Sequence, residues 1–168
     1  QKLLFIYFSF IHHNISSLVI YIKSKTIIFK YINIYLLHFI PPDDAAQVVM
    51  FKEPVRGSFF TLEATRTYDS KDLASIAEFD FLDKDGNPMT ALNLTVSGVD
   101  SEEEVREDGV AENAIDGQVE AFWLTSSRTL PHWIEFCSPD KVEVHGFRYT
   151  PRQTKSTGRI CDWKFYVR

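Results

Sequence analysis

Residues 113–123 bring together a turn, a carboxylate and two large aromatic side chains within eleven residues. Asp116-Gly117 is a turn dipeptide, because the aspartate side chain accepts hydrogen bonds from nearby backbone and glycine tolerates positive φ. Aspartate is also among the residues that bind hard cations such as calcium, which take several carboxylate and carbonyl oxygens from one rigid loop. Phe122 and Trp123 follow the turn and supply a large apolar surface. We expect a tight loop whose aromatic end is anchored on the core of a small domain.

A second group of polar side chains, near the C-terminal end, has the chemistry that sugar recognition uses. Arginine offers planar paired donors, amides and carboxylates offer acceptors, and an aromatic ring covers the apolar face of a sugar. The candidates are Arg152, Gln153, Arg159 and Asp162, with His132 and Trp163 as further members. Two alternatives stay open. The arginines could pair with loop carboxylates, and Trp163, which alternates in phase with apolar neighbours, could belong to the core.

The chain has no recognisable catalytic constellation. Neither Cys137 nor Cys161 has a histidine partner placed by a motif, and the sequence contains no Gly-x-Ser-x-Gly elbow or phosphate-binding loop. The two cysteines match no metal-binding spacing, and we expect them to be free buried thiols, with a single disulfide between them as the alternative. We therefore predict a binding protein and not an enzyme, although a pair of glycosidase carboxylates would be revealed only by geometry.

The distribution of charge argues against one class of partner. Residues 1–40 contain four lysines and no Asp or Glu, so the other 128 residues hold the remaining 14 of the 18 basic side chains against all 23 acidic ones, a balance of −9. Such an acidic domain repels phosphate backbones. We expect no nucleic-acid partner, whereas neutral sugars and cations suit this surface.

Residues 1–42 differ in composition from the rest of the chain. Residues 1–40 consist almost entirely of Ile, Leu, Phe, Tyr, Lys, Ser, Asn and His. A membrane helix over residues 3–22 would carry His12, His13 and Asn14 in mid-span, which is costly in hydrocarbon, and an export signal would lack a small-residue cleavage site. The restriction to residues with A/T-rich codons favours a third interpretation, a translated segment that is not under selection as protein. Membrane contact is expected only if the segment is a true anchor.

Pro41-Pro42 marks a boundary, and we expect residues 43–168 to form one domain. Short runs of β-branched and aromatic residues alternate with turns there, and the expected strands are 59–64, 74–82, 92–96, 132–137, 142–149 and 163–167. All seven glycines lie in this part, mostly in or beside the connections. Strands at this spacing predict an all-β sandwich or barrel and not alternating βαβ units.

Five short pieces of this domain resemble the discoidin family, also called the coagulation factor 5/8 type C domain. They are 74–79 (ASIAEF), 113–117 with 122–123 (NAIDG, FW), 131–134 (PHWI), 146–153 (GFRYTPRQ) and 158–167 (GRICDWKFYV). The last four follow the order that the family shows. The resemblance implies an eight-stranded antiparallel jelly-roll β-sandwich, galactose-binding-domain-like, with a ligand site on loops at one end.

The same resemblance implies a function. It suggests a non-catalytic carbohydrate-binding module of an extracellular or cell-surface protein, for instance one appended to a glycoside hydrolase, with a glycan or glycoprotein as its partner. The alternative is a protein- or phospholipid-binding adhesion module of the same fold, because the family includes both. Lipid binders would be expected to show exposed apolar loop tips with basic support, and this acidic domain has little of either.

The order of the strands departs from the family. Segments resembling 59–64 and 74–79 usually close the domain, after the piece that resembles 158–167, whereas here they precede it. Either the chain joins the tail of one module to the front of another, or an early strand fills the closing place. The second arrangement requires residues 59–81 to pair with the strand that contains Trp163.

The resemblance also implies a structural calcium ion. Members of the family often bind one with the loop that corresponds to 113–123 and with a glutamate, and the expected ligands here are Asp116, Glu78 and Asn113. Gln118 stands where Asp or Asn is common, and Ala121 where Thr is common, so two oxygens are lost. The alternative is a hydrogen-bonded turn in which Asp116 caps its own backbone.

Overall fold

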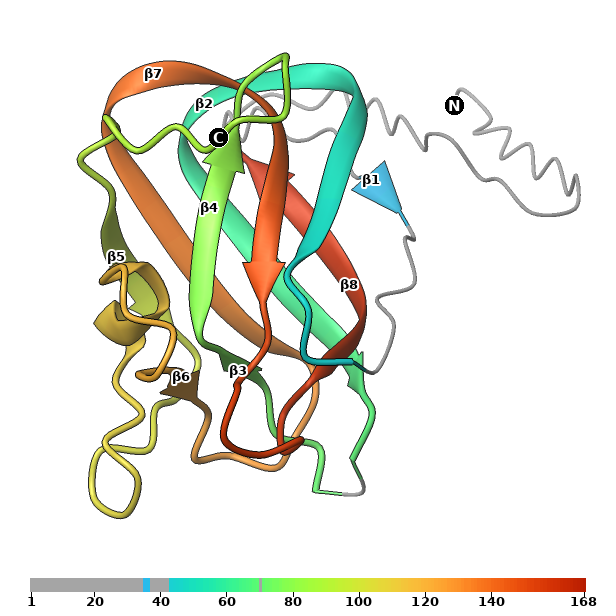
Figure 1. Ribbon diagram of the computed structural model, residues 1–168, viewed down its shortest axis with the longest axis vertical. Helices are drawn as coiled ribbons and strands as arrows, with labels where there is room; N and C mark the ends of the chain where they lie inside the picture. The colour runs from blue at the N-terminus through green and yellow to red at the C-terminus, as the bar shows by residue number, and fades with distance from the viewer. Residues whose placement is uncertain (1–34, 37–42, 70) are drawn as a thin grey trace, which may run out of the picture.

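The protein was analysed as a computed structural model, which describes residues 35–36, 43–69 and 71–168. The expectations for residues 1–34 and 37–42 lie outside the described residues. The described residues form eight strands and one short 3-10 helix (Figure 1). The strands run antiparallel in two layers, so the predicted all-β antiparallel sandwich is confirmed. None of the helical structure in the described part is long and apolar enough to cross a membrane.

Two very long strands build both layers. β2 (Gln47–Thr67) has 21 residues and β7 (His132–Thr150) has 19, and they pair with each other along nearly their whole lengths. At about 3.3 Å per residue, a straight strand of that length would span ~70 Å, far more than a small domain. Register shifts between Met50 and Val55 and between Gly57 and Phe59 mark where the pair bends. Each strand therefore passes from one layer into the other.

The shorter strands complete the two layers. In the first layer, β4 (Glu78–Leu82) pairs with the C-terminal half of β7, which pairs with the N-terminal half of β2. In the second layer, β5 (Thr95–Val99) pairs with the N-terminal half of β7, and β8 (Ile160–Val167) pairs with the C-terminal half of β2. β1 (Tyr35–Leu36) pairs with the outer edge of β8. A small sheet of β3 (Ser75–Ile76) and β6 (Trp123–Leu124), with the 3-10 helix η1 (Ala111–Ile115), lies toward one end.

Aromatic side chains fill the space between the layers. Buried and less buried residues alternate along β8 and along the first half of β7, which sends every second side chain inward. Phe79 of the first layer stacks on Phe136 of the second, with ring centroids 4.6 Å apart. Each fully buried phenylalanine contributes about 2–3 kcal/mol through burial of apolar surface. The core is therefore what holds the curved strands together.

The unusual strand order is resolved by the pairing of β2. Ala64 of β2 lies opposite Trp163 of β8, and the segment 60–67 pairs along β8, so the pairing that the second arrangement requires is present for this segment. The part of the prediction that extended this pairing to residue 81 is wrong, because β4 pairs with β7. The strand expected at 92–96 begins only at Thr95, since Leu92 donates its N–H to the Met89 carbonyl in a preceding turn.

Candidate functional site

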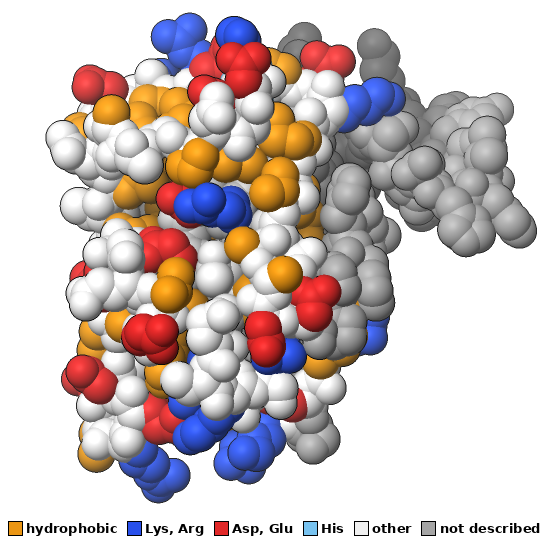
Figure 2. Space-filling view, viewed as in Figure 1, with side chains coloured by type: hydrophobic (Ala, Val, Ile, Leu, Met, Phe, Trp, Pro, Cys, Tyr) orange, Lys and Arg blue, Asp and Glu red, His pale blue; other side chains and the backbone are white. Residues whose placement is uncertain are grey.

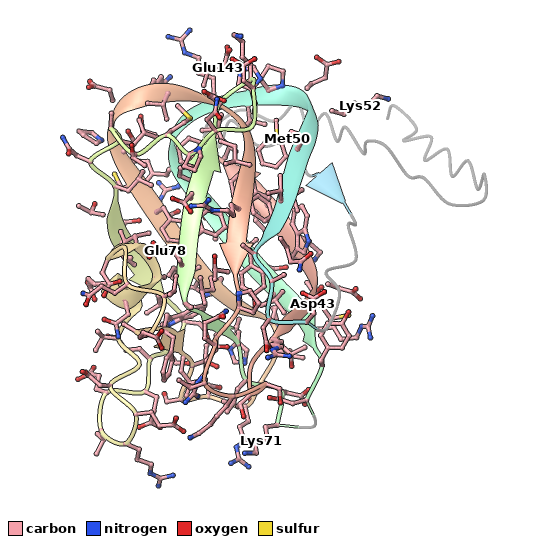
Figure 3. The ribbon with its side chains drawn as sticks, in the orientation of Figure 1. Asp43, Met50, Lys52, Lys71, Glu78 and Glu143 are labelled. Carbon is pink, nitrogen blue, oxygen red and sulfur yellow. The ribbon has the colours of Figure 1, made fainter. Side chains whose placement is uncertain are left out.

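The polar residues of interest gather at the end of the sandwich where β3 and β6 lie. Loops from several parts of the chain meet there, among them 68–74, 100–110, 116–122 and 151–159 (Figure 1). Lys and Arg side chains gather at this lower end beside Asp and Glu (Figure 2). Asp43 and Lys71 lie toward the same end, and Met50, Lys52 and Glu143 toward the other (Figure 3).

Arg152 occupies the second loop position after β7 with its guanidinium group almost fully enclosed. Its side chain is 3% exposed, and its guanidinium carbon lies 3.8 Å from the centre of the Phe122 ring, in cation–π geometry. The Nε donates to Thr154 at 3.1 Å and Nη2 pairs with Glu107, while Nη1 has no hydrogen-bond partner among the described residues. An arginine fixed on an aromatic ring with a spare donor is suited to binding a hydroxyl or carboxylate oxygen.

Glu107 bridges two cations of this loop. Besides Arg152, it accepts a hydrogen bond from Lys155 at 3.0 Å. The hydrogen bonds from Arg152 and then Lys155 hold the pKa of the Glu107 carboxyl below its usual value. Glu107 belongs to the acidic run 102–108, and the sequence contains no spacing that would have matched it to a partner 45 residues away.

Arg159 and Gln153 are tied to the segment that precedes β2. The guanidinium of Arg159 forms an ion pair with the Asp44 carboxylate, and the Gln153 amide donates to the Asp44 carbonyl at 3.0 Å. Gly158, with φ of +82°, packs so closely on β3 that a Cβ atom would lie 2.8 Å from the Ser75 nitrogen. The structure thus brings Arg152, Gln153 and Arg159 together on one loop, and both arginines pair with carboxylates, as the alternative interpretation expected.

The other three predicted ligand residues make their contacts elsewhere. Trp163 is 1% exposed and packs edge-on against Phe147 in the core, with centroids 4.9 Å apart. Asp162 accepts two hydrogen bonds from Arg66 of the neighbouring strand, at 2.8 and 3.2 Å. The ring contact of Trp163 and the hydrogen bonds of Asp162 with Arg66 are made to the neighbouring strands β7 and β2, and not to the loop that carries Arg152.

His132 is a fully buried connector at the start of β7. Its Nδ1 lies 2.7 Å from the Asp100 carboxylate and its Nε2 lies 2.6 Å from the Asp72 carbonyl. Both partners are acceptors, so both ring nitrogens carry protons and the ring is an imidazolium. Burial alone would lower the pKa of His132, but the hydrogen bonds to Asp100 and Asp72 outweigh it and the pKa is raised. The residue holds loops together and offers no accessible surface to a ligand.

The loop that carries Asp116 behaves as a capped turn. Asp116 accepts the Gln118 N–H at 2.8 Å, and Gly117 has φ of +77°. Asn113 spans the loop, because its amide donates to the carbonyls of Asp108 and Phe122. Trp123, at the aromatic end, is buried and donates to the Ser101 carbonyl at 3.1 Å. The expected tight loop anchored on the core is confirmed.

Glu78, the first residue of β4, lies beside this turn with one carboxylate oxygen unsatisfied. Burial, followed by the nearby carboxylates of Asp80 and Asp116, raises the pKa of Glu78 to about 7, although the N–H groups of Gly117 and Phe79 donate to it. Its buried Oε2 has no hydrogen-bond partner among the described residues. An orphaned carboxylate oxygen beside a second carboxylate fits a calcium ion, which would neutralise both.

The set of calcium ligands within the described residues is small. No group of three or more His, Cys, Asp or Glu side chains in that part of the chain has metal-binding geometry. Glu78 and Asp116 would therefore need carbonyl oxygens of the loop as additional ligands. Both cysteines are free, as predicted. Cys161 is buried, whereas Cys137 is half-buried.

Comparison with known proteins gives one partial match. No protein-family model matches the chain. The chain is similar to a sialidase from Micromonospora viridifaciens, with 37% identity over 84 residues. The match covers 47% of this chain and only 13% of the sialidase, so it concerns a small part of a much longer protein.

Proposed function

We propose that this chain is a non-catalytic carbohydrate-binding module of the discoidin type that holds a glycan on the loops around Arg152. The similarity to a sialidase supports a carbohydrate-related module. The match covers only 13% of the sialidase, which supports a module that is not itself catalytic. The antiparallel sandwich with polar loops at one end suits such a role. An extracellular or cell-surface location is part of the proposal.

The observation that carries the proposal is the arrangement of Arg152 on Phe122. The ring fixes the guanidinium plane, and Nη1 is a buried donor without a partner among the described residues, so a sugar oxygen reaches it only when the loop around Arg152 opens. Gln153, exposed on the same loop, adds an amide. Glu107 competes for the guanidinium and would have to share it with the ligand.

A glycan array probed with the chain and with Arg152→Lys tests this function. Lysine keeps the charge and loses the planar pair of donors, so we expect about a 10-fold or greater loss of affinity for the bound glycan, equivalent to ~1.4 kcal/mol. Arg56→Lys is the matched control, since Arg56 is exposed at the other end beside Glu143. Binding to anionic vesicles and to no glycan would overturn the proposal in favour of a lipid-binding module.

The proposal includes a structural calcium ion. Glu78 and Asp116 supply the carboxylates, and carbonyl groups of 113–123 supply the remaining oxygens. When bound, the ion supplies positive charge that offsets the repulsion between the two carboxylates. The residues of the loop itself hold the turn and place Phe122 beneath Arg152.

A further inference from the structure

The outer face of the second layer carries an ordered set of polar side chains around one tryptophan. Along β7, β2 and β8 the inward positions are buried, so the residues between them point outward. The outward residues in the centre of this face are Trp133, Glu135, Thr61, Glu63, Lys164 and Tyr166. This face lies on the sheet and not on the loops that carry Arg152.

Trp133 forms a flat apolar platform on this face. It is 36% exposed, while Trp123 and Trp163 are each 1% exposed. A Cβ atom on Gly98 of the adjacent strand would lie 3.3 Å from two carbon atoms of the indole, so the ring extends over backbone that carries no side chain. The glycine thus allows the indole to lie against β5 while part of it stays in solvent.

Hydrogen-bonding groups continue from the platform across the sheet. Glu63 is the cross-strand partner of Trp133, and Lys164 is the partner of Glu63, which places the three in a row over about two strand spacings, ~10 Å. Glu63 accepts hydrogen bonds from Lys164 at 3.1 Å and from the Tyr166 hydroxyl at 3.2 Å. Both donors thus hold the Glu63 carboxylate in place on the strand next to the one that carries Trp133.

A second row of polar side chains runs beside the first. Glu135 accepts from Thr61 at 3.2 Å, from Ser97 at 2.8 Å and from Arg168 at 2.8 Å. The two carboxylates of the face are balanced by Lys164 and Arg168, so the face has no excess charge. These side chains are already held by one another, which reduces the entropy lost when a ligand binds.

We propose that this face is a second glycan-binding site, distinct from the loop site, which takes a neutral oligosaccharide lying across the strands. One exposed aromatic ring surrounded by fixed donors and acceptors matches a sugar, which has an apolar ring face and a rim of hydroxyl groups. A protein partner would call for a wider apolar patch, and an anionic glycan for unbalanced positive charge. One sugar ring stacks on Trp133, and the next meets Glu63 and Lys164.

Quenching of tryptophan fluorescence by acrylamide tests this site directly in the whole chain. Because Trp133 is the exposed one of the three tryptophans, the quenching reports mainly on it. The probes are hexasaccharides of glucose, galactose, mannose, xylose and N-acetylglucosamine. We expect at least one to reduce the quenching constant about twofold at saturation. Isothermal titration calorimetry, which does not need the indole, should show that Trp133→Ala weakens binding of that hexasaccharide at least 10-fold while Trp133→Phe retains most of it.

Arg152→Lys separates this site from the loop site. Protection of Trp133 that persists in Arg152→Lys supports the face site. Glycan binding that is lost in Arg152→Lys and unchanged in Trp133→Ala overturns the face site and leaves the loop site standing. If no hexasaccharide protects Trp133 in any variant, the face site is also overturned, and the array result alone then decides the loop site.

Discussion

Glu78 is a carboxylate that the fold buries without giving both of its oxygens a partner. Its folded-state pKa of about 7 lies above the ordinary value of 4.5, so the folded protein binds a proton there that the unfolded chain releases. The contribution of Glu78 is therefore most favourable at low pH and is lost as the pH rises toward 7. By linkage, holding the charged form at higher pH costs about 3 kcal/mol, and a bound cation would remove much of that cost.

Replacement of Glu78 by glutamine tests this account by thermal unfolding at pH 8. Without calcium, Glu78→Gln should raise Tm by several degrees, because the buried charge is gone. Millimolar calcium chloride should raise the Tm of the parent chain relative to a chelator and leave Glu78→Gln unchanged. Glu112→Gln, an exposed glutamate of η1, is the control and should behave like the parent. Equal Tm values for the parent in calcium and in chelator would contradict a structural ion.

At the residue scale, the sequence indicated the types of polar side chain in the candidate site, but it did not predict which of them would contact one another. Arg152, Gln153 and Arg159 lie on one loop, where Gln153 and Arg159 both contact Asp44 and Arg152 pairs with Glu107. Their carboxylate partners, Glu107 and Asp44, lie 45 residues or more away in the chain, and no local pattern encodes such a pairing. The exposure of Trp133 on the outer face of the second layer was not predicted either, because the direction of its side chain depends on the register of the strand.

At the scale of elements, His132 joins three parts of the chain that do not pair in a sheet. The imidazolium connects the start of β7 to Asp100, which follows β5, and to Asp72, which precedes β3. The same Asp100 carboxylate accepts the Trp133 N–H at 2.8 Å. A raised pKa means that this connection stabilises the fold fully below the ordinary histidine pKa of 6.5 and loses that contribution as the pH rises through the folded value.

Removal of the imidazole should therefore destabilise the protein, most strongly at acidic pH. We expect His132→Ala to lower the free energy of unfolding at pH 6 by about 2–4 kcal/mol, because a half-buried carboxylate and a carbonyl lose their donor. The difference from the parent should shrink as the pH is raised. His145→Ala, a partly exposed histidine beside Glu143, is the control and should cost less than about 1 kcal/mol. Urea titrations at several pH values measure both, and a His132→Ala cost that grows with pH would contradict the charged connection.

The strands themselves were largely predictable, and their lengths were not. Alternation of apolar residues and turn signals located segments in all of β2, β4, β7 and β8. Periodicity could not show that 132–137 and 142–149 form one bent strand, because the polar residues between them look like a turn and only pairing with β2 makes them continuous. Nor could it split 74–82 into β3 and β4, which join different sheets.

At the scale of the whole molecule, the fold separates a rigid scaffold from two polar surfaces. The core of stacked aromatics fixes the sheets, the loops around Arg152 form one end, and the outward residues around Trp133 form a face of the second layer. The acidic balance of the domain agrees with a neutral ligand on either surface. The resemblance noted in short motifs, together with the partial similarity to a sialidase, is the reason to expect that ligand to be a glycan.

The central claim, glycan binding by the loops around Arg152, is tested most directly by NMR. Amide spectra of the chain are recorded while a glycan selected on the array is titrated. The account predicts saturable shifts that are largest for residues 152–159 and Phe122, with none of comparable size at the opposite end around 52–56 and 140–143. Saturable shifts confined to that opposite end, or no shifts with any glycan, would contradict it.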